Sequence, residues 1–98
     1  MWLSKSFVNI TLTMLEILDE KVSVVSVYNK DKGSAKPFKM RWKTHDIVFS
    51  EVTYHHLVRE GRNVLHVFHA TDGVMDYRLH LDTQTLHWKL IEVSDGNP

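Results

Sequence analysis

Residues 64–90 read VLHVFHATDGVMDYRLHLDTQTLHWKL, and this stretch decides the fold. Apolar and polar residues alternate along it, which is the period of a β-strand with one buried face. Turn-forming residues interrupt the alternation at Asp72-Gly73 and again over residues 82–85. An Asp-Gly pair between alternating runs is typical of a tight hairpin, because both residues tolerate a positive φ. The stretch therefore predicts three antiparallel strands joined by two hairpins.

The two turns also predict which residues lie opposite each other. A two-residue turn at Asp72-Gly73 pairs Thr71 with Val74. A four-residue second turn pairs Leu81 with Leu86. Both pairings gather one apolar set on a single face, which comprises Phe68, Tyr77, Leu79, Leu81, Leu86, Trp88 and Leu90. One buried face and one solvated face are typical of an antiparallel sheet.

More strands are predicted upstream of this stretch. A β-branched run covers residues 22–28, residues 36–43 alternate strictly, and residues 47–58 form a longer strand that turns back through Glu60-Gly61-Arg62. No helical pattern of useful length interrupts residues 21–93, which argues against a parallel α/β fold. We therefore predict an all-β protein, an antiparallel meander of six or seven strands that forms a curled sheet or a small open barrel.

The ends of the chain carry less regular patterns. Residues 7–14 alternate as a strand does, while the apolar spacing over residues 14–20 also fits a short helix. We predict a strand or short helix over residues 7–20. Residues 1–6 and 94–98 are predicted to be flexible, and the 98 residues are expected to form a single domain.

The composition excludes several function classes. Twelve Lys and Arg balance twelve Asp and Glu, so the net charge is zero, which disfavours nonspecific binding to nucleic acid or to an anionic membrane. The chain has no cysteine, which excludes disulfides, thiol catalysis and cysteine-ligated metals. No apolar run is long enough to span a membrane. These features and the lack of an export signal lead us to expect a cytoplasmic protein.

Seven histidines make the chain histidine-rich and supply its candidate chemistry. A three-residue turn over residues 60–62 pairs His56 with His66, on the same face as Tyr54 and Phe68. These residues predict either core histidines that are hydrogen-bonded to each other or a small polar pocket. The pocket is formed by Tyr54, His56, His66 and Tyr77.

His80 and His87 are the candidate metal ligands. The predicted hairpin places them across from each other on the polar face, close enough to share one ion. A site needs three or four ligands, and Arg78 stands beside them on the same face. We therefore expect no metal site and no cofactor.

The strand over residues 36–43 is the candidate nucleic-acid contact. Its cations, Lys36, Lys39, Arg41 and Lys43, alternate with Phe38, Met40 and Trp42. Cations with stacking aromatics are typical of single-strand binders, but here the two kinds lie on opposite faces. The alternative is a core-facing strand whose lysines protect a sheet edge from aggregation.

Several segments together resemble a group of small, uncharacterised bacterial β-domains. They lie between Pro37 and Asp95 and comprise Lys39-Met40-Arg41-Trp42-Lys43, Arg59-Glu60-Gly61-Arg62, His66-Val67-Phe68, Thr71-Asp72-Gly73, Tyr77-Arg78-Leu79 and the spaced run Leu86, Trp88, Leu90, Glu92. The resemblance implies a β-sheet protein and transfers no functional residue.

No nucleophile elbow and no phosphate-binding loop is present in the sequence, which favours a protein that is not an enzyme. We expect a small non-catalytic β-domain that acts through protein–protein contacts, with a homodimer as the first expectation and another protein partner as the second. The alternatives are a nucleic-acid-binding β-barrel that uses residues 36–43, and a ligand-binding or enzymatic pocket at the four residues named above.

Overall fold

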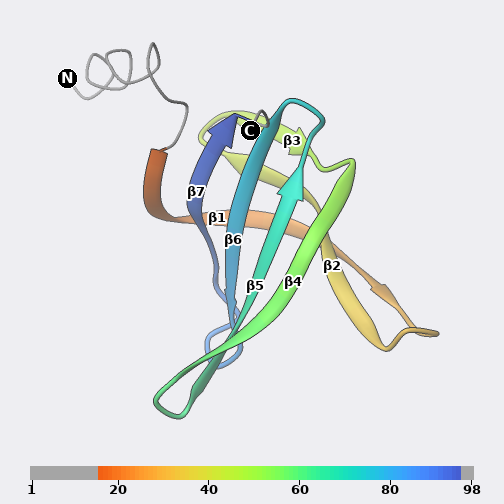
Figure 1. Ribbon diagram of the computed structural model, residues 1–98, viewed down its shortest axis with the longest axis vertical. Coiled ribbons are helices and arrows are strands. Elements are labelled where there is room, and N and C mark those ends of the chain that lie inside the picture. The colour runs from red at the N-terminus through yellow and green to blue at the C-terminus, as the bar shows by residue number, and fades with distance from the viewer. Residues whose placement is uncertain (1–15, 96–98) are drawn as a thin grey trace.

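A computed structural model describes residues 16–95 of this chain, and these residues form one sheet of seven antiparallel strands (Figure 1). The strands are β1 (Glu16–Asn29), β2 (Ser34–Trp42), β3 (His45–Val48), β4 (Glu51–Glu60), β5 (Asn63–Thr71), β6 (Met75–Asp82) and β7 (Trp88–Asp95). No helix occurs between residues 16 and 95, so the all-β prediction is confirmed. The same residues therefore contain no helix that could cross a membrane.

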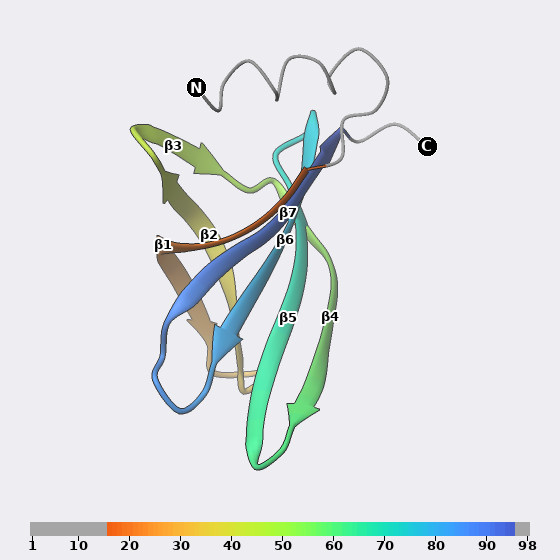
Figure 2. The same cartoon turned by 90° about the vertical axis from the view of Figure 1, so that its left-hand side faces the viewer.

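The strand order β3-β2-β1-β7-β6-β5-β4 is that of a meander bent back on itself. Every neighbouring pair except β1 and β7 is consecutive in the chain, and the pairing of β1 with β7 curls the sheet. In Figure 2, β2 and β3 lie on the opposite side of the curl from β4 and β5. The barrel stays open between β3 and β4, which are the two edges of the sheet.

The linker between the two edge strands ties them together at one end of the opening. The amide of Phe49 donates to the carbonyl of Phe38 on β2 at 2.9 Å. The next amide, that of Ser50, donates to the carbonyl of Thr71 on β5 at 2.8 Å. Beyond this tie, β4 runs to its tip with only β5 beside it.

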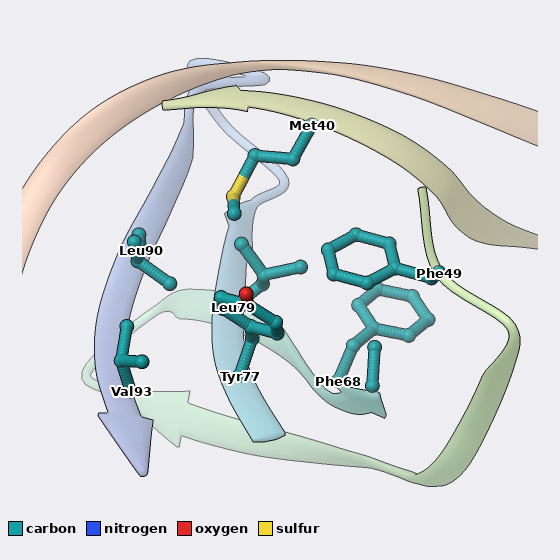
Figure 3. Close-up of a cluster of buried hydrophobic side chains, with 8 residues drawn as sticks. Met40, Phe49, Phe68, Tyr77, Leu79, Leu90 and Val93 are labelled. Atoms are coloured by element: carbon teal, nitrogen blue, oxygen red, sulfur yellow. The ribbon is translucent and has the colours of Figure 1, made fainter. Parts of the chain in front are cut away.

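The core fills the inside of the curl, which we call the inner face (Figure 3). Its buried members are Met40, Phe49, Phe68, Ala70, Tyr77, Leu79, Leu90 and Val93. Four residues of the predicted apolar set belong to it, while Leu81 and Trp88 pack against it half-buried. Leu86 was wrongly placed in this set, because it lies in the β6–β7 loop with 71% of its surface exposed.

The two predicted hairpin registers were wrong, each by two residues. Thr71 pairs with Asp76 instead of Val74, and Leu81 pairs with Trp88 instead of Leu86. In both turns an aspartate side chain reshapes the loop: Asp72 Oδ1 accepts from two following amides, and so does Asp82 Oδ1. A shift of two residues keeps every side chain on its face, so the predicted faces survived these errors.

The β4–β5 register was wrong by one residue, and this error exchanged the faces. The turn contains two residues, Gly61-Arg62, with Gly61 at φ 62°, so Glu60 pairs with Asn63. His55 therefore lies opposite Phe68, and His56 lies opposite Val67. A β-bulge between Val52 and Tyr54 reverses the alternation again near the start of β4.

Strand β3 pairs only with residues 39–42, so the first residues of β2 have no β3 residue beside them. Met40 and Trp42 point inward as predicted, but Phe38 does not join them and is 47% exposed. Phe38 is an extra, bulged residue of β2, because Val25 of β1 pairs with Lys39 and the next residue, Ser26, pairs with Pro37. The bulge shifts the phase of β2, so that Pro37 is buried instead.

At the N-terminal end, the prediction for residues 7–20 was a strand or a short helix, and Glu16 to Glu20 form a strand as part of β1. Ser94 and Asp95 belong to β7 and pair with β6. The predictions for residues 1–15 and 96–98 lie outside the described residues.

Candidate functional site

The inner face of β4 and β5 carries a continuous stack of rings. His55 stacks on Phe68 with ring centroids 4.3 Å apart and on His66 with centroids 5.0 Å apart. His55 Nε2 and His66 Nδ1 are 2.8 Å apart, so one imidazole donates a hydrogen bond to the other. The ring centroids of Phe68 and Trp88 are 5.5 Å apart. The stack connects the core to β4 and holds the edge strand in a defined position.

The opposite face of these strands, which we call the outer face, carries a second cluster. The ring centroid of Tyr54 lies 5.0 Å from that of His56 and 5.5 Å from that of His69. The ring centroids of the two imidazoles are 5.9 Å apart. Nδ1 of His56 is buried and has no hydrogen-bond partner among the described residues. Leaving a buried polar atom without a partner costs about 1–3 kcal/mol. A group that binds this imidazole would therefore stabilise the cluster.

Burial lowers the pKa of three histidines, His55 on β4, His69 on β5 and His80 on β6. His66 adds to the effect at His55, and the charge of Arg78 adds to it at the other two. At neutral pH these rings are therefore uncharged, the form that accepts hydrogen bonds and binds metals.

The predicted pocket of two tyrosines and two histidines is not assembled. Tyr54 and His56 lie on the outer face, whereas His66 lies on the inner face, so His56 and His66 do not pair. Tyr77 is buried in the core against Phe49, at 5.6 Å between ring centroids. The single-residue register error explains the separation of the two histidines.

Tyr77 has a structural partner instead. Its hydroxyl donates to Asp72 Oδ2 at 2.9 Å, while Asp72 Oδ1 accepts from the amides of Val74 and Met75. Burial and then the Asp72 carboxylate raise the pKa of Tyr77. Burial opposes ionisation of Asp72 as well, but the hydrogen bonds outweigh it, so the pKa of Asp72 is lowered. The pair links the β5–β6 turn to the core.

His80 and His87 are not cross-strand partners, because His80 pairs with Lys89. Both histidines line an outer-face groove of about 680 Å³, together with Lys21 and Lys89. Within residues 16–95, no group of three or more His, Asp or Glu side chains is arranged to hold a metal in a single chain.

The basic strand separates its cations from its aromatics. Arg41 binds Asp46 through Nε at 2.8 Å and through a second nitrogen at 3.1 Å. Trp42 turns inward and donates to Glu20 at 2.7 Å, with the Lys43 ammonium 5.2 Å from its ring. Lys36 and Lys39 pair with Val27 and Val25 of β1. This geometry leaves no row of aromatics beside the cations on which bases could stack.

The remaining candidate is the side of β4 that faces away from β5, which we call the β4 edge. No strand between residues 16 and 95 pairs with it. A two-residue hairpin closes on a hydrogen-bonded pair, here Glu60 and Asn63, and the pattern alternates from there. The backbone groups of His55, Leu57 and Arg59 therefore point away from β5. They form a row of donors and acceptors that is open to another strand.

The two edges of the sheet differ in how they are protected. The edge strand β3 has only four residues, and its Asp46 forms an ion pair with Arg41 of β2. Where β2 extends beyond β3, the residue that lies there is Pro37. The β4 edge has ten residues and contains neither lysine nor proline. Short strands, lysines and prolines are the usual protection of an edge, so β4 lacks these three devices.

Comparisons with protein-family models, with curated proteins and with solved structures found no match for this chain. The site therefore has to be judged on its own geometry. Sequence reasoning missed the β4 edge as a site, although one signal was present: the strand predicted over residues 47–58 is the longest predicted strand, and it contains neither lysine nor proline.

Proposed function

We propose that this chain is a non-catalytic β-domain that acts through protein–protein contacts and self-associates through the β4 edge into a two-fold dimer. The single observation that carries the proposal is the ten-residue strand whose outward side pairs with no described strand. Backbone groups on such an edge gain hydrogen bonds when a second strand is added, and the neighbouring side chains supply specificity.

The side chains on β4 support a strand as the partner. Tyr54 is 58% exposed and Leu57 is 59% exposed, and they project from opposite faces of the strand. An added strand would cover both of them, which gains free energy from the burial of apolar surface. The ring stack through His55 keeps β4 in place, so little ordering is required before pairing.

A second copy of the chain is the favoured partner, because the β4 edge is self-complementary. An antiparallel pair of identical strands satisfies the donors and acceptors of both copies, and closed two-fold dimers are the commonest homo-oligomers. The chain has no net charge, so little overall repulsion opposes association. Its lack of cysteine is compatible with the cytoplasm as the compartment.

The test is the mass of the full chain in solution, measured by sedimentation velocity across micromolar concentrations. We expect a dimer, and we expect Leu57→Pro to be monomeric, because proline removes an outward-pointing amide and leaves the bonds to β5 intact. Val74→Lys is the matched control: Val74 is 72% exposed but lies in a turn, so the dimer should persist. A wild-type monomer at every concentration, or a Leu57→Pro variant that folds and still dimerises, would overturn the proposal.

A further inference from the structure

The charges of this chain are unevenly distributed, although they cancel overall. Residues 21–43 contain seven cations and a single carboxylate, Asp31, so this segment carries a net charge of +6. The cations are Lys21, Lys30, Lys32, Lys36, Lys39, Arg41 and Lys43. Residues 44–98 contain four cations and eight carboxylates. A chain with no net charge can therefore attract an acidic partner through this one segment.

The basic segment forms the β1–β2 hairpin, whose end projects from the sheet. In Figure 1 the turn of this hairpin lies well away from β4 and β5. Every residue from Val25 to Lys36 is exposed, and so is Phe38. The exposed residues include three large apolar side chains besides Phe38, namely Val25, Val27 and Tyr28. Exposed apolar side chains that adjoin one another usually mark an interaction surface.

Cations and apolar side chains share the outer face of the hairpin. Val24 and Met40 point inward to the core, so their chain neighbours Val25 and Lys39 point outward. Lys39 lies between Val25 on β1 and Val48 on β3, which are its cross-strand partners. Each ammonium group therefore has apolar side chains beside it.

The bulge in β2 adds an aromatic ring to this surface. Strict alternation would have turned Phe38 inward with Met40, but as the bulged residue it is exposed, next to Lys39 in the chain. Towards the turn of the hairpin, Val27 pairs with Lys36. Neither lysine forms an ion pair within the described part of the chain, so both charges are available to a partner.

Two shallow hollows follow each other along β2. One, of about 230 Å³, is lined by Val25, Lys39 and Arg41 among others. The other, of about 290 Å³, is lined by Lys36 and Phe38 together with residues at the start of β4. Both are smaller than the roughly 300–1,000 Å³ of small-molecule sites, so each suits a single side chain.

The carboxylates beside the hollows do not cancel this charge. Asp46 is bound to Arg41 at 2.8 Å and so is already neutralised. Glu51 lines the second hollow, at the start of β4. A negatively charged partner is therefore attracted chiefly to Lys36 and Lys39.

These features fit an extended peptide better than a nucleic acid or a membrane. Stacked bases need several rings on one face, and alternation along β1 turns Tyr28 to the opposite face from Val27. The turn over residues 29–33 has no apolar side chain that could enter a bilayer. An extended peptide can present apolar side chains to the hollows and carboxylates to the lysines between them.

We propose that the outer face of the β1–β2 hairpin is a second protein-binding surface, which takes an extended segment of another protein that combines carboxylates with apolar side chains. Val25, Val27 and Phe38 supply the apolar contacts, and Lys36 and Lys39 supply the charge. The surface lies on other strands than the β4 edge, so the inference does not rest on the proposed dimer.

The experiment selects peptides of nine residues, the length of β2, from a random display library on the full chain. We expect the enriched peptides to combine Asp or Glu with Leu, Ile or Phe. Their affinity, measured by fluorescence anisotropy, should fall as the salt concentration rises. Lys36→Glu with Lys39→Glu should lower the affinity by about tenfold or more, and Phe38→Ser by about threefold or more.

The matched control is Lys30→Glu with Lys32→Glu. It makes the same change of charge at the turn, outside both hollows, so the affinity should stay within about twofold of the wild type. The monomeric variant Leu57→Pro should bind the enriched peptides as the wild type does. An equal loss in the control and in the Lys36 and Lys39 variant would reflect net charge alone and overturn the proposal.

The remaining outcomes also decide the matter. No enrichment, or enriched peptides without carboxylates, overturns the proposal. Binding to oligothymidine or to vesicles of anionic phospholipid, with none to acidic peptides, assigns the surface to a nucleic acid or a membrane instead. Assembly of Leu57→Pro into larger species at low salt gives the surface to the acidic half of a second copy, which equally overturns the proposal.

Discussion

Leu86 is held in a backbone conformation that leucine rarely adopts. Its φ is 63°, and its side chain is 71% exposed, so no packing offsets the strain. A non-glycine residue in this region costs about 1–2 kcal/mol. Glycine avoids this cost, but it also gives the unfolded chain more conformational entropy, which cancels part of the gain in stability. We expect Leu86→Gly to stabilise the fold by about 0.5–1 kcal/mol in urea unfolding. Leu86→Ala keeps the strain and should bring no such gain; equal effects of the two variants would contradict the argument.

Asp72 and Tyr77 act as a coupled pair. Asp72→Ala removes three accepted hydrogen bonds and leaves the buried Tyr77 hydroxyl without its partner, so we expect a loss of about 2–3 kcal/mol. Tyr77→Phe should cost about 1 kcal/mol in the wild type and little or nothing once Asp72 is alanine. The measurement is a double-mutant cycle by urea unfolding, and strict additivity would show that the hydrogen bond contributes nothing.

Strands β4, β5 and β6 carry histidines that make the sheet sensitive to acid. Folding lowers the pKa of His55, His69 and His80, so the unfolded chain binds protons first as the pH falls. The contribution of these residues to stability is present above the unfolded pKa, near 6.5, and is lost as the pH falls below it. We expect the melting temperature to decrease between about pH 6.5 and 5, before carboxylates titrate.

The matched variants assign this effect to the strands. Replacing His69 and His80 by glutamine should flatten the pH dependence. His45→Gln, at the exposed start of β3, should leave it unchanged. A wild-type melting temperature that stays constant over this range would contradict the prediction.

At the scale of the whole molecule, the proposed dimer joins two curled sheets through their open edges. In a continuous antiparallel sheet the two-fold axis is perpendicular to the sheet, so one residue lies opposite its own copy. Two registers align nine residues of Glu51–Glu60, and they place the axis at His55 or at His56. The bulge selects His56, because a centre at His55 sets the bulged residue Thr53 against Leu57 of the second copy.

The chain has no cysteine, so a single introduced thiol reports this register directly. His56→Cys should form a disulfide dimer under mild oxidation, because the Cα atoms of a non-hydrogen-bonded pair lie about 4.5 Å apart, within disulfide range. The readout is a non-reducing gel.

His55→Cys provides the control for this register. Its copies lie two residues apart along the paired strands, about 8 Å between Cα atoms, which is too far for a disulfide. Rapid crosslinking through position 55, with none through position 56, would show that the axis lies at His55 instead.

The sequence alone determined the kind of structure and much of its inside. Period-2 alternation is a local property of the backbone, so it predicted the strands and placed Phe68, Leu79 and Leu90 in the core. The two hairpin errors did not disturb this result, because a shift of two residues preserves the faces. The polar surface could also be predicted, down to the outward direction of Arg41.

The candidate site depended on the tertiary structure. The pairing of β1 with β7 joins strands far apart in the chain, and it leaves β3 and β4 as edges. No local pattern contains that information, because the curl of the whole sheet decides which strands meet. The one-residue difference at the Gly61-Arg62 turn decided that His56 joins His69 and not His66. A shift of a single residue leaves the local alternation pattern almost unchanged, but it moves every side chain of the strand to the other face. Only the assembled sheet could therefore select between the two registers.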